Sequence, residues 1–471
     1  MRHTKLAMAK PFEGAPKINL ASVYGASPKK PILLRIPVTG ERPITYGATN
    51  LPEGLELKNG IITGQINEEG NYTVLLTAEN TLGKTEKELT FEIKEDGVVL
   101  TPLMGFTSWN AYGQHTSQEK MLNTAKQMID LGIAEYGYSY INTDSGWQGQ
   151  YGGKFDAVMP NEKFPDIKGM VDELHTMGFK CGIYSSPMLY CWPYAEKYPG
   201  CTCGEPDIRF YEMNDGIGVD RREKNNAKQW EEWGFDYLKY DWIPTDAYNA
   251  DLMKQELLKL NRDMGFCVTV SAMIENHLYW EKNCTSYRSN EDAHGTWDNL
   301  LRVYSSYPQF SRFVKKGHYF DLDMLDVGTC ECAEGQFRFT EDEKLVAYSM
   351  RAFLNSPIQI STKLEFADEF ELSMYCNEEL IDINQDCGFK TPVLIVDDKD
   401  GDKMLHVYKK ELEDGTYAYA AFNFGETKEN VEIALEEKLT VRDAWAKEDV
   451  GCMDKIAISM EPHTVRIFTT K

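Results

Sequence analysis

Short apolar runs alternate with helical stretches rich in lysine and glutamate from about Leu100 to residue 387, and this alternation limits the possible folds more than any other feature. It is typical of repeated βα units, whose strands lie parallel in one sheet. One unit in about 36 residues fits a (β/α)8 TIM barrel with modest insertions. We therefore predict a barrel over residues 100–387 with eight strands: Met104–Ser108, Tyr140–Thr143, Lys180–Tyr184, Tyr237–Tyr240, Cys267–Ser271, Ser286–Ser289, Tyr319–Asp323 and Ile358–Ser361.

The regions on either side of the barrel have the pattern of β domains. Before residue 100, runs such as Ile61–Gly64 and Tyr72–Ala78 are separated by turn residues every eight to twelve positions, which predicts a small β-sandwich over residues 1–99. After the barrel, Asp414-Gly415 has the sequence of a hairpin turn. We predict a C-terminal antiparallel β-sandwich over residues 388–471, with strands at Val393–Val396, Met404–Tyr408, Tyr417–Asn423, Val431–Ala434 and Val465–Thr469.

Composition and charge exclude several classes of protein. The 471 residues are 42% hydrophobic and 12% aromatic, enough for several cores, so a disordered or fibrous chain is excluded. Lysine and arginine number 50 against 74 aspartates and glutamates, and the net charge of −24 repels nucleic acid and anionic membrane surfaces. No run of eighteen apolar residues is present, so we expect no membrane insertion.

The N-terminal sequence and the cysteines give information on the cellular compartment of the protein. The opening MRHTKLAMAKPFEG has an apolar stub of only four residues, too short for the core of a signal peptide. We expect the export signal to be absent or already removed, and favour a periplasmic or secreted location over a cytoplasmic one. The eleven cysteines cannot all pair, and Cys201-x-Cys203 and Cys330-x-Cys332 fall short of a zinc or iron–sulfur spacing, so one or two disulfides are conceivable.

Acidic and aromatic residues gather where the predicted strands end. Active sites of such barrels are built from the carboxyl ends of the strands. Converging carboxylates repel one another, so a lysine and an arginine among them are needed to keep chosen acids ionised. This combination is typical of a two-carboxylate glycosidase, in which tryptophan faces also stack on sugar rings. The residues at these strand ends are Trp109, Asp144, Trp147, Tyr184, Lys239, Asp241, Arg288, Asp292, Asp321 and Asp323.

Each of these residues also has an ordinary structural explanation. An aspartate that ends a strand is more often a helix N-cap than a catalyst. A tryptophan near the rim is as often packed in the core as on a sugar. Lys239-Tyr-Asp241 fits a salt-bridged strand end, and Arg288 with Asp292 fits a local ion pair. Their joint occurrence at successive strand ends is what favours an active site.

Eight motifs in order resemble glycoside hydrolase family 27, the melibiases or α-galactosidases, over residues 101–471. The motifs are Met104-Gly-Phe-Thr-Ser-Trp109-Asn110, Asn142-Thr-Asp144-Ser-Gly-Trp147, Gly182-Ile-Tyr184, Trp233-Gly-Phe-Asp-Tyr-Leu-Lys239-Tyr-Asp241, Tyr287-Arg288-x-x-x-Asp292, Asp321-x-Asp323-Met324-Leu325, Asn355-Ser-Pro357 and Ile383-Asn-Gln-Asp386. The stretch 51–80 separately resembles the immunoglobulin-like modules often fused to bacterial carbohydrate enzymes, which are usually spacers. The resemblance implies an oligosaccharide or glycan as substrate.

The family resemblance implies a retaining exo-α-galactosidase that needs no metal or organic cofactor. Asp241 would be its nucleophile and Asp292 its general acid/base, with their carboxyl groups about 5–5.5 Å apart. Lys239 lies two residues before Asp241, on the same strand face, where it would hold that carboxylate ionised and bond a sugar hydroxyl. The implied sugar-binding residues are Arg288 near the anomeric end, Asp144 and Tyr184 on the far side, Trp109 as the floor, and Asp323 with Met324 closing the pocket.

Several departures from the family pattern concern the substrate. Ser145 stands where the family commonly has a second aspartate for the 4- and 6-hydroxyls of galactose. Ser271-Ala-Met273-Ile-Glu275 replaces the run whose glutamate binds the 2-hydroxyl, so either Met273 takes that place or Glu275 serves from a shifted loop. Pro187–Arg222 is expected to be a longer loop that reshapes the pocket mouth.

Two alternatives therefore share the mechanism but differ in sugar. Ala272 and Met273 keep an α-N-acetylgalactosaminidase open, because smaller residues there make room for an acetamide. A β-L-arabinopyranosidase has an equivalent reacting geometry. A non-catalytic carbohydrate-binding protein is the rival of a different class, and the presence of both Asp241 and Asp292 counts against it.

Overall fold

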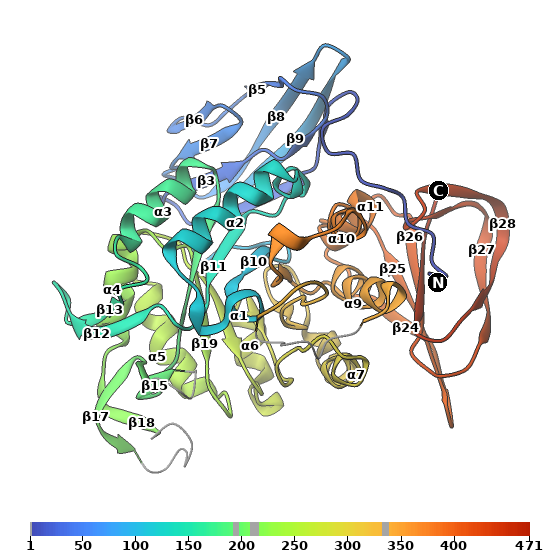
Figure 1. The fold of residues 1–471 in the computed structure, drawn as a ribbon. Coiled ribbons are helices and arrows are strands. Elements are labelled where there is room, and N and C mark those ends of the chain that lie inside the picture. Colours follow the sequence, from blue (N-terminus) through green and yellow to red (C-terminus); the bar gives the residue numbers. More distant parts are fainter. Residues whose placement is uncertain (1, 192–196, 208–215, 332–338) are drawn as a thin grey trace.

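The computed structural model describes residues 2–191, 197–207, 216–331 and 339–471. They form a small N-terminal β-sandwich, a central barrel and a C-terminal antiparallel sheet, in chain order from blue to red in Figure 1. The predicted fold class, a TIM barrel flanked by an immunoglobulin-like sandwich and an antiparallel β domain, is confirmed.

The central sheet contains eight parallel strands, and each overlaps one predicted from the sequence. It closes into a ring through a parallel bridge between Leu325 and Ile360. Two strands are shorter than predicted by two residues or more, since only Ser286–Tyr287 and Tyr319–Phe320 keep strand pairing. Asp323 adopts a left-handed backbone with φ of 63°. The strands, in chain order, are β10 (Met104–Thr107), β11 (Tyr140–Thr143), β14 (Lys180–Ser185), β19 (Tyr237–Asp241), β20 (Gly265–Thr269), β21 (Ser286–Tyr287), β22 (Tyr319–Phe320) and β23 (Ile358–Ile360).

Helices cover the outside of the ring, and polar side chains fix where several of them begin. Ser117, Asp166 and Asp246 accept hydrogen bonds from the first turns of α2, α3 and α5, and Thr340 forms a capping box with Glu343 at the start of α9. The helices are α1 (Ser108–Tyr112), α2 (Gln118–Asp130), α3 (Ile167–Thr176), α4 (Glu223–Trp233), α5 (Ala247–Leu257), α6 (His277–Asn283), α7 (Trp297–Ser305), α8 (Tyr307–Phe310), α9 (Glu341–Phe353), α10 (Glu369–Tyr375) and α11 (Glu378–Asn384).

The N-terminal sandwich has its own core and two main sheets. Ile36, Val74, Leu76 and Phe91 are buried at its centre. One sheet orders β2 (Val23–Ala26), β9 (Gly83–Ile93), β8 (Gly70–Asn80) and β5 (Thr45–Thr49), and the other β3 (Ile32–Arg35), β7 (Ile61–Gly64) and β6 (Leu55–Lys58); β1 (Lys17–Ile18) pairs with β4 (Val38–Thr39). The sandwich lies against the barrel at the end where the strands begin (Figure 1).

Charged groups attach the sandwich to the barrel. Glu135, in the short helix η2 (Ile133–Tyr136) of the barrel, pairs with Arg35 at 2.6 Å and Arg42 at 3.2 Å. Its second oxygen accepts the backbone N–H of Val38 at 3.0 Å. Lys254 of α5 reaches back to Asp96 at 2.7 Å. These contacts make the sandwich part of one packed body with the barrel.

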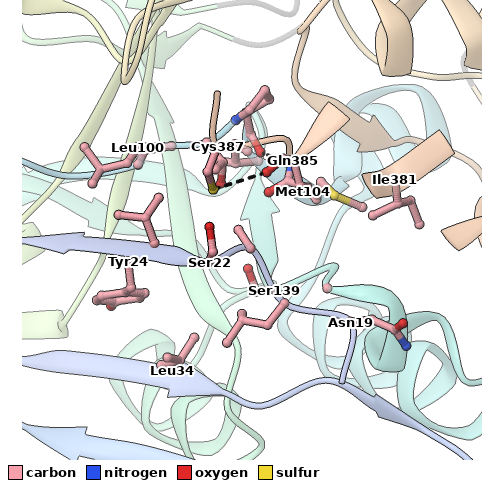
Figure 2. Close-up of a pocket in the computed structure, with 18 of the residues that line it drawn as sticks. Asn19, Ser22, Tyr24, Leu34, Leu100, Met104, Ser139, Ile381, Gln385 and Cys387 are labelled. Atoms are coloured by element: carbon pink, nitrogen blue, oxygen red, sulfur yellow. Dashed lines mark hydrogen bonds between the residues drawn. The ribbon is translucent and has the colours of Figure 1, made fainter. Parts of the chain in front are cut away.

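A cavity of about 350 Å³ lies between the sandwich and the amino ends of the barrel strands. Figure 2 shows Ser22 and Tyr24 of the sandwich, with Met104, Gln385 and Cys387 on the opposite side above them. The cavity is thus at the end of the barrel away from the predicted acidic residues.

The C-terminal sheet is antiparallel, with the order β24-β25-β26-β29-β27-β28. The predicted turn at Asp414-Gly415 joins β25 to β26. The N-terminal segment ties this sheet to the rest, because Thr4 donates to the carbonyl of Val465 at 3.1 Å and Ala7 to that of Trp445 at 2.9 Å (Figure 1). The strands are β24 (Val393–Asp400), β25 (Lys403–Glu411), β26 (Tyr417–Asn423), β27 (Glu429–Asp443), β28 (Glu448–Met460) and β29 (Thr464–Thr470).

The ten cysteines within the described residues are all free, so the structure shows no disulfide in that part of the chain. Cys332, the second residue of the Cys330-x-Cys332 pair, lies outside the described residues. Among the described helices, none combines the length and apolar character needed to cross a membrane.

Candidate active site

Asp241 is the last residue of β19 and is held from the strands on both sides of it. Tyr184 of β14 donates its hydroxyl to one carboxylate oxygen at 2.7 Å. Thr269, the last residue of β20, donates to the other oxygen at 2.5 Å. The carboxylate is 8% exposed, so two fixed donors orient a nearly buried anion.

Lys239, two residues earlier on the same strand, pairs with Asp144 rather than directly with Asp241. Its ammonium lies 2.7 Å from a carboxylate oxygen of Asp144, and the backbone N–H of Ser145 donates to the other oxygen at 2.7 Å. Burial raises the pKa of Asp144, and the charge of Lys239 opposes that rise. The negative charge of Asp241 also acts on Lys239, so the lysine interacts with that carboxylate through space.

Asp292 is paired with Arg288 at the mouth of the same cluster. Arg288 is 1% exposed and donates to Asp292 at 2.8 Å, whereas the Asp292 side chain is 47% exposed. Burial acts to raise the pKa of Asp292, but the charges of Arg288 and Lys239 outweigh it and leave the pKa below its usual value. Asp292 is therefore an accessible, ionised carboxylate in the free protein.

Asp323 supports Arg288 from the other side. Its carboxylate lies 3.4 Å from the guanidinium of Arg288 and accepts the backbone N–H of Ala293 at 2.6 Å. Asp321, two residues before, accepts the backbone N–H of Asp323 at 2.8 Å. Burial and the neighbouring Asp323 raise the pKa of Asp321 to about 6.

The two ion-pair groups belong to one electrostatic cluster. Arg288 interacts with the charges of Asp323, Asp292 and Asp241. Lys239 interacts with those of Asp144, Asp241 and Asp323. Four carboxylates thus surround two cations at the carboxyl ends of the strands, an arrangement that can stabilise a positively charged sugar-like transition state.

Of the remaining predicted site residues, Ser145 and Met324 directly follow members of this cluster in the chain, whereas Trp109 and Met273 come from other segments. Trp109 of α1 is half-buried, and Met324 is 2% exposed directly after Asp323. Ser145 is fully buried, and its hydroxyl has no hydrogen-bond partner within the described residues. Met273 is half-buried in the loop after β20.

The two candidates for contact with the 2-hydroxyl differ in exposure. Met273 is fixed by its carbonyl, which accepts the indole N–H of Trp280 at 2.8 Å. Glu275 lies in the short helix η3 (Ile274–Asn276) and is exposed. The structure therefore fixes Met273 in the loop more firmly than Glu275.

The long segment after β14 forms two small hairpins within its described parts. These are β15 (Tyr190–Cys191) with β16 (Tyr198–Pro199), and β17 (Thr202–Asp207) with β18 (Ile217–Arg221); residues 192–196 and 208–215 of this predicted loop lie outside the described residues. Cys191 and Tyr198 pack against Tyr184, which contacts Asp241. Tyr198 also lines a polar cavity of about 740 Å³ beside the hairpin of β12 (Gln148–Gly152) and β13 (Ala157–Pro160).

Thr269 was missed by the sequence analysis. It is the polar last residue of an otherwise apolar strand, so the strand-end rule that selected Asp241 applies to it equally. The predicted fifth strand ended two residues too late, at Ser271, and this shift hid Thr269 inside the strand.

One group at the opposite end of the barrel has donor atoms that could hold a metal. His175, Cys181 and Asp236 have ligand atoms within 4.8 Å of one another. However, Asp236 accepts from Arg262 at 2.6 Å, from the backbone N–H of Cys181 at 2.9 Å, and lies 2.8 Å from His175. The carboxylate is already paired by these groups, which is the arrangement of a buried ion pair.

Comparisons with known proteins identify a family for each of the three regions. Residues 101–386 match the family described as "Alpha galactosidase A", residues 402–470 the "Alpha galactosidase C-terminal beta sandwich domain", and residues 16–94 the "Putative Ig domain". The chain is 26% identical over 395 residues to "Alpha-galactosidase 2" of Arabidopsis thaliana, covering 80% of this chain and 91% of the plant protein.

Solved structures also match most of the chain. A Bacteroides fragilis crystal structure described as a "putative alpha-galactosidase/melibiase" has a TM-score of 0.87 at 29% identity, covering 98% of this chain and 99% of that chain. A β-L-arabinopyranosidase from Geobacillus stearothermophilus shares the fold with a TM-score of 0.68 at 21% identity, covering 79% of this chain and 96% of that chain.

Proposed function

Because the chain belongs to the alpha galactosidase A family and is a glycoside hydrolase, we propose that it is a retaining exo-α-galactosidase, which releases terminal α-linked galactose from oligosaccharides or glycans. The observation that carries this proposal is the pair of carboxylates, Asp241 and Asp292, within one cluster at the carboxyl ends of the strands. Relatives named as α-galactosidases support the choice of sugar.

In the first half of the proposed reaction, Asp241 attacks the anomeric carbon. A bond forms between its carboxylate oxygen and that carbon, the glycosidic bond breaks, and Asp292 gives its proton to the departing oxygen. Tyr184 and Thr269 fix the orientation of the Asp241 carboxylate through their hydroxyl hydrogen bonds. In the second half, Asp292 takes a proton from water, whose oxygen displaces Asp241 from the anomeric carbon.

The role of Asp292 as an acid requires a change in its protonation on substrate binding. In the free protein Arg288 keeps the pKa of Asp292 low, and the side chain is half-exposed to water. A bound sugar displaces that water, and the loss of solvation raises the pKa of the carboxyl toward the range of a general acid. The same residue then works as a base once the leaving group has taken its proton.

We assign the other polar groups of the cluster to sugar hydroxyls. Lys239 with Asp144 offers a charged donor and acceptor to one side of the ring, and Arg288 with Asp323 to the side near the anomeric carbon. Trp109 supplies an aromatic face, and Met273 and Met324 complete the apolar contact.

The second candidate is the same mechanism on another pyranose. Ser145 gives the end of β11 a small buried hydroxyl instead of a second carboxylate, which favours a sugar without a hydroxymethyl group there, such as β-L-arabinopyranose. The solved β-L-arabinopyranosidase shows that this fold also carries that activity. An exchanged anchor changes discrimination by about 1–3 kcal/mol, so it alters the preferred sugar and leaves the reaction type intact.

A panel of 4-nitrophenyl glycosides tests the proposal. We expect the α-galactoside to be cleaved with the highest kcat/KM, ahead of the β-L-arabinopyranoside and the α-N-acetylgalactosaminide. A preference for the arabinopyranoside would support the second candidate. Binding of galactose without cleavage of any member would support a non-catalytic carbohydrate-binding protein and contradict the proposal.

A further inference from the structure

Arg351, in the last turn of α9, is a fully buried arginine that the proposed mechanism does not use. It is 1% exposed and donates to the carbonyl oxygens of Leu322 at 2.8 Å, Asp323 at 2.8 Å and Met324 at 2.7 Å. A fourth donor goes to the carbonyl of Ala347 in its own helix at 2.9 Å. Within the described residues, no carboxylate oxygen lies close enough to form a salt bridge with it.

Three successive carbonyls that point to one guanidinium define an unusual turn. Buried carbonyl oxygens gathered in one place repel each other and lose their hydrogen bonds to water, so they need donors from the protein. The middle residue, Asp323, is also a non-glycine residue with a left-handed φ of 63°. The planar fork of an arginine can satisfy such a set of acceptors, which a single ammonium cannot do in the same geometry.

The turn matters because it presents Asp323 to the segment that carries Asp292. The carboxylate of Asp323 accepts the backbone N–H of Ala293, the residue directly after Asp292, at 2.6 Å. It also lies 3.4 Å from Arg288, which donates to Asp292 at 2.8 Å. Asp323 therefore holds both the backbone next to Asp292 and the cation that pairs with it.

We propose that Arg351 is a positioning residue for the acid/base carboxylate, acting through the turn Leu322–Met324 and the carboxylate of Asp323. This inference rests on the proposed role of Asp292. Arg351 is buried and makes its bonds to main-chain carbonyls, so it fixes geometry and takes no part in the chemistry. Loss of the turn would displace Asp323 from Ala293 and leave Arg288 to act on Asp292 alone.

Arg351→Lys tests the proposal, because it keeps the positive charge and removes the planar set of guanidinium N–H donors. Hydrolysis of methyl α-galactoside, whose leaving group needs protonation, should fall by about 10²-fold, whereas that of 2,4-dinitrophenyl α-galactoside should change little. The basic limb of the kcat profile, which reports the pKa of Asp292 in the substrate complex, should move to lower pH, because Arg288, no longer shared with Asp323, lowers that pKa further. The other charged groups that act on Asp292, Lys239 and His294, stay unchanged.

Tyr348→Phe is the matched control on the same helix. Its hydroxyl is buried and bonds to that of Tyr138 at 3.1 Å, away from the turn. It should lower the melting temperature without any dependence on the leaving group. If Arg351→Lys does not fold, Arg351→Gln, whose amide can still donate to two carbonyls, is taken through the same assays.

The double variant with Asp292→Ala separates this inference from the proposed function. Once Asp292 is absent, Arg351→Lys should cost no further leaving-group sensitivity. Equal losses on both substrates for Arg351→Lys, with a clear leaving-group effect for Asp292→Ala, would overturn the positioning role alone. Absence of a leaving-group effect for Asp292→Ala would instead overturn the acid/base assignment and the inference with it.

Discussion

Buried carboxylates have different surroundings at the two ends of the barrel. At the amino ends of the strands, Glu135 meets two arginines and a backbone N–H, and Asp236 meets Arg262, His175 and the N–H of Cys181. At the carboxyl ends, burial raises the pKa of Asp321 to about 6 and that of Asp326 to about 7.

The difference indicates that the carboxylates at the amino ends stabilise the structure, whereas those at the carboxyl ends serve the reaction. At the amino ends, the pairs of Glu135 hold the sandwich on the barrel, those of Asp236 join parts of the barrel itself, and both carboxylates keep little free capacity for a ligand. The carboxylates at the carboxyl ends repel one another, and the positive charges of Lys239 and Arg288 offset that repulsion. These carboxylates therefore remain available to a substrate. Substitutions at the two ends should therefore separate activity from stability.

The largest effect is expected for Asp241→Asn. The amide cannot form the glycosyl-enzyme, so kcat should fall by about 10³-fold or more while the fold and galactose binding persist. Steady-state kinetics, circular dichroism and calorimetric binding of galactose measure the three properties. A residual rate near that of the wild type would remove Asp241 from the nucleophile role.

Asp292→Ala should come next. Loss of a general acid costs about 10²–10⁴-fold on a substrate with a poor leaving group and far less on an activated one. Comparison of kcat/KM for methyl and 2,4-dinitrophenyl α-galactosides measures the difference. Similar losses on the two substrates would argue against an acid/base role.

Glu135→Gln tests the opposite end. Arg35 and Arg42 would lose their buried counter-charge, and removal of one partner of such a group costs about 3 kcal/mol or more. We expect a lower melting temperature with unchanged kcat. Glu173→Gln, which breaks an exposed pair with Lys126, is the control and should change the melting temperature little. A loss of activity in Glu135→Gln at a temperature where it is folded would contradict the separation of the two ends.

Asp326 gives a pH-dependent effect on stability. Its pKa is about 7 in the folded protein, because burial and Asp323 raise it more than Arg351 lowers it, and about 3.9 when unfolded. The folded state thus binds the proton more tightly, and the stability this gives is lost as pH rises from about 4 to about 7. Asp326→Asn has no carboxyl proton to lose. Its melting temperature should therefore rise relative to that of the wild type as the pH increases from about 4 to about 7. A difference that does not vary with pH would contradict a raised pKa.

Much of the architecture could be predicted because strands in the ring are short apolar runs between polar ones. Each of the eight predicted strands overlaps an observed one. The strand β28 (Glu448–Met460) was missed because most of its residues face solvent, and the alternation of Ile456, Ile458 and Met460 is confined to its last part. β27 (Glu429–Asp443) was predicted only in part, because its middle contains Glu436, Glu437 and Lys438.

Candidate site residues that end strands could be predicted from the sequence. Contacts between side chains of different strands and helices could not. Asp241, Arg288 and Asp292 follow from the motifs and the strand-end rule. The pairing of Lys239 with Asp144 depends on the distance between strands, which the sequence does not contain. Arg351 lies in a helix far along the chain, and only the folded turn shows that three carbonyls converge on it.

The most direct measurement of the central claim is to trap the glycosyl-enzyme. An activated, fluorinated galactoside whose intermediate hydrolyses slowly should add one sugar mass to the protein, and peptide mass spectrometry should locate it on Asp241. Asp292→Ala should still be labelled, since an activated leaving group needs no acid. A label on another residue, or turnover of the reagent with inversion and no label at all, would contradict the account.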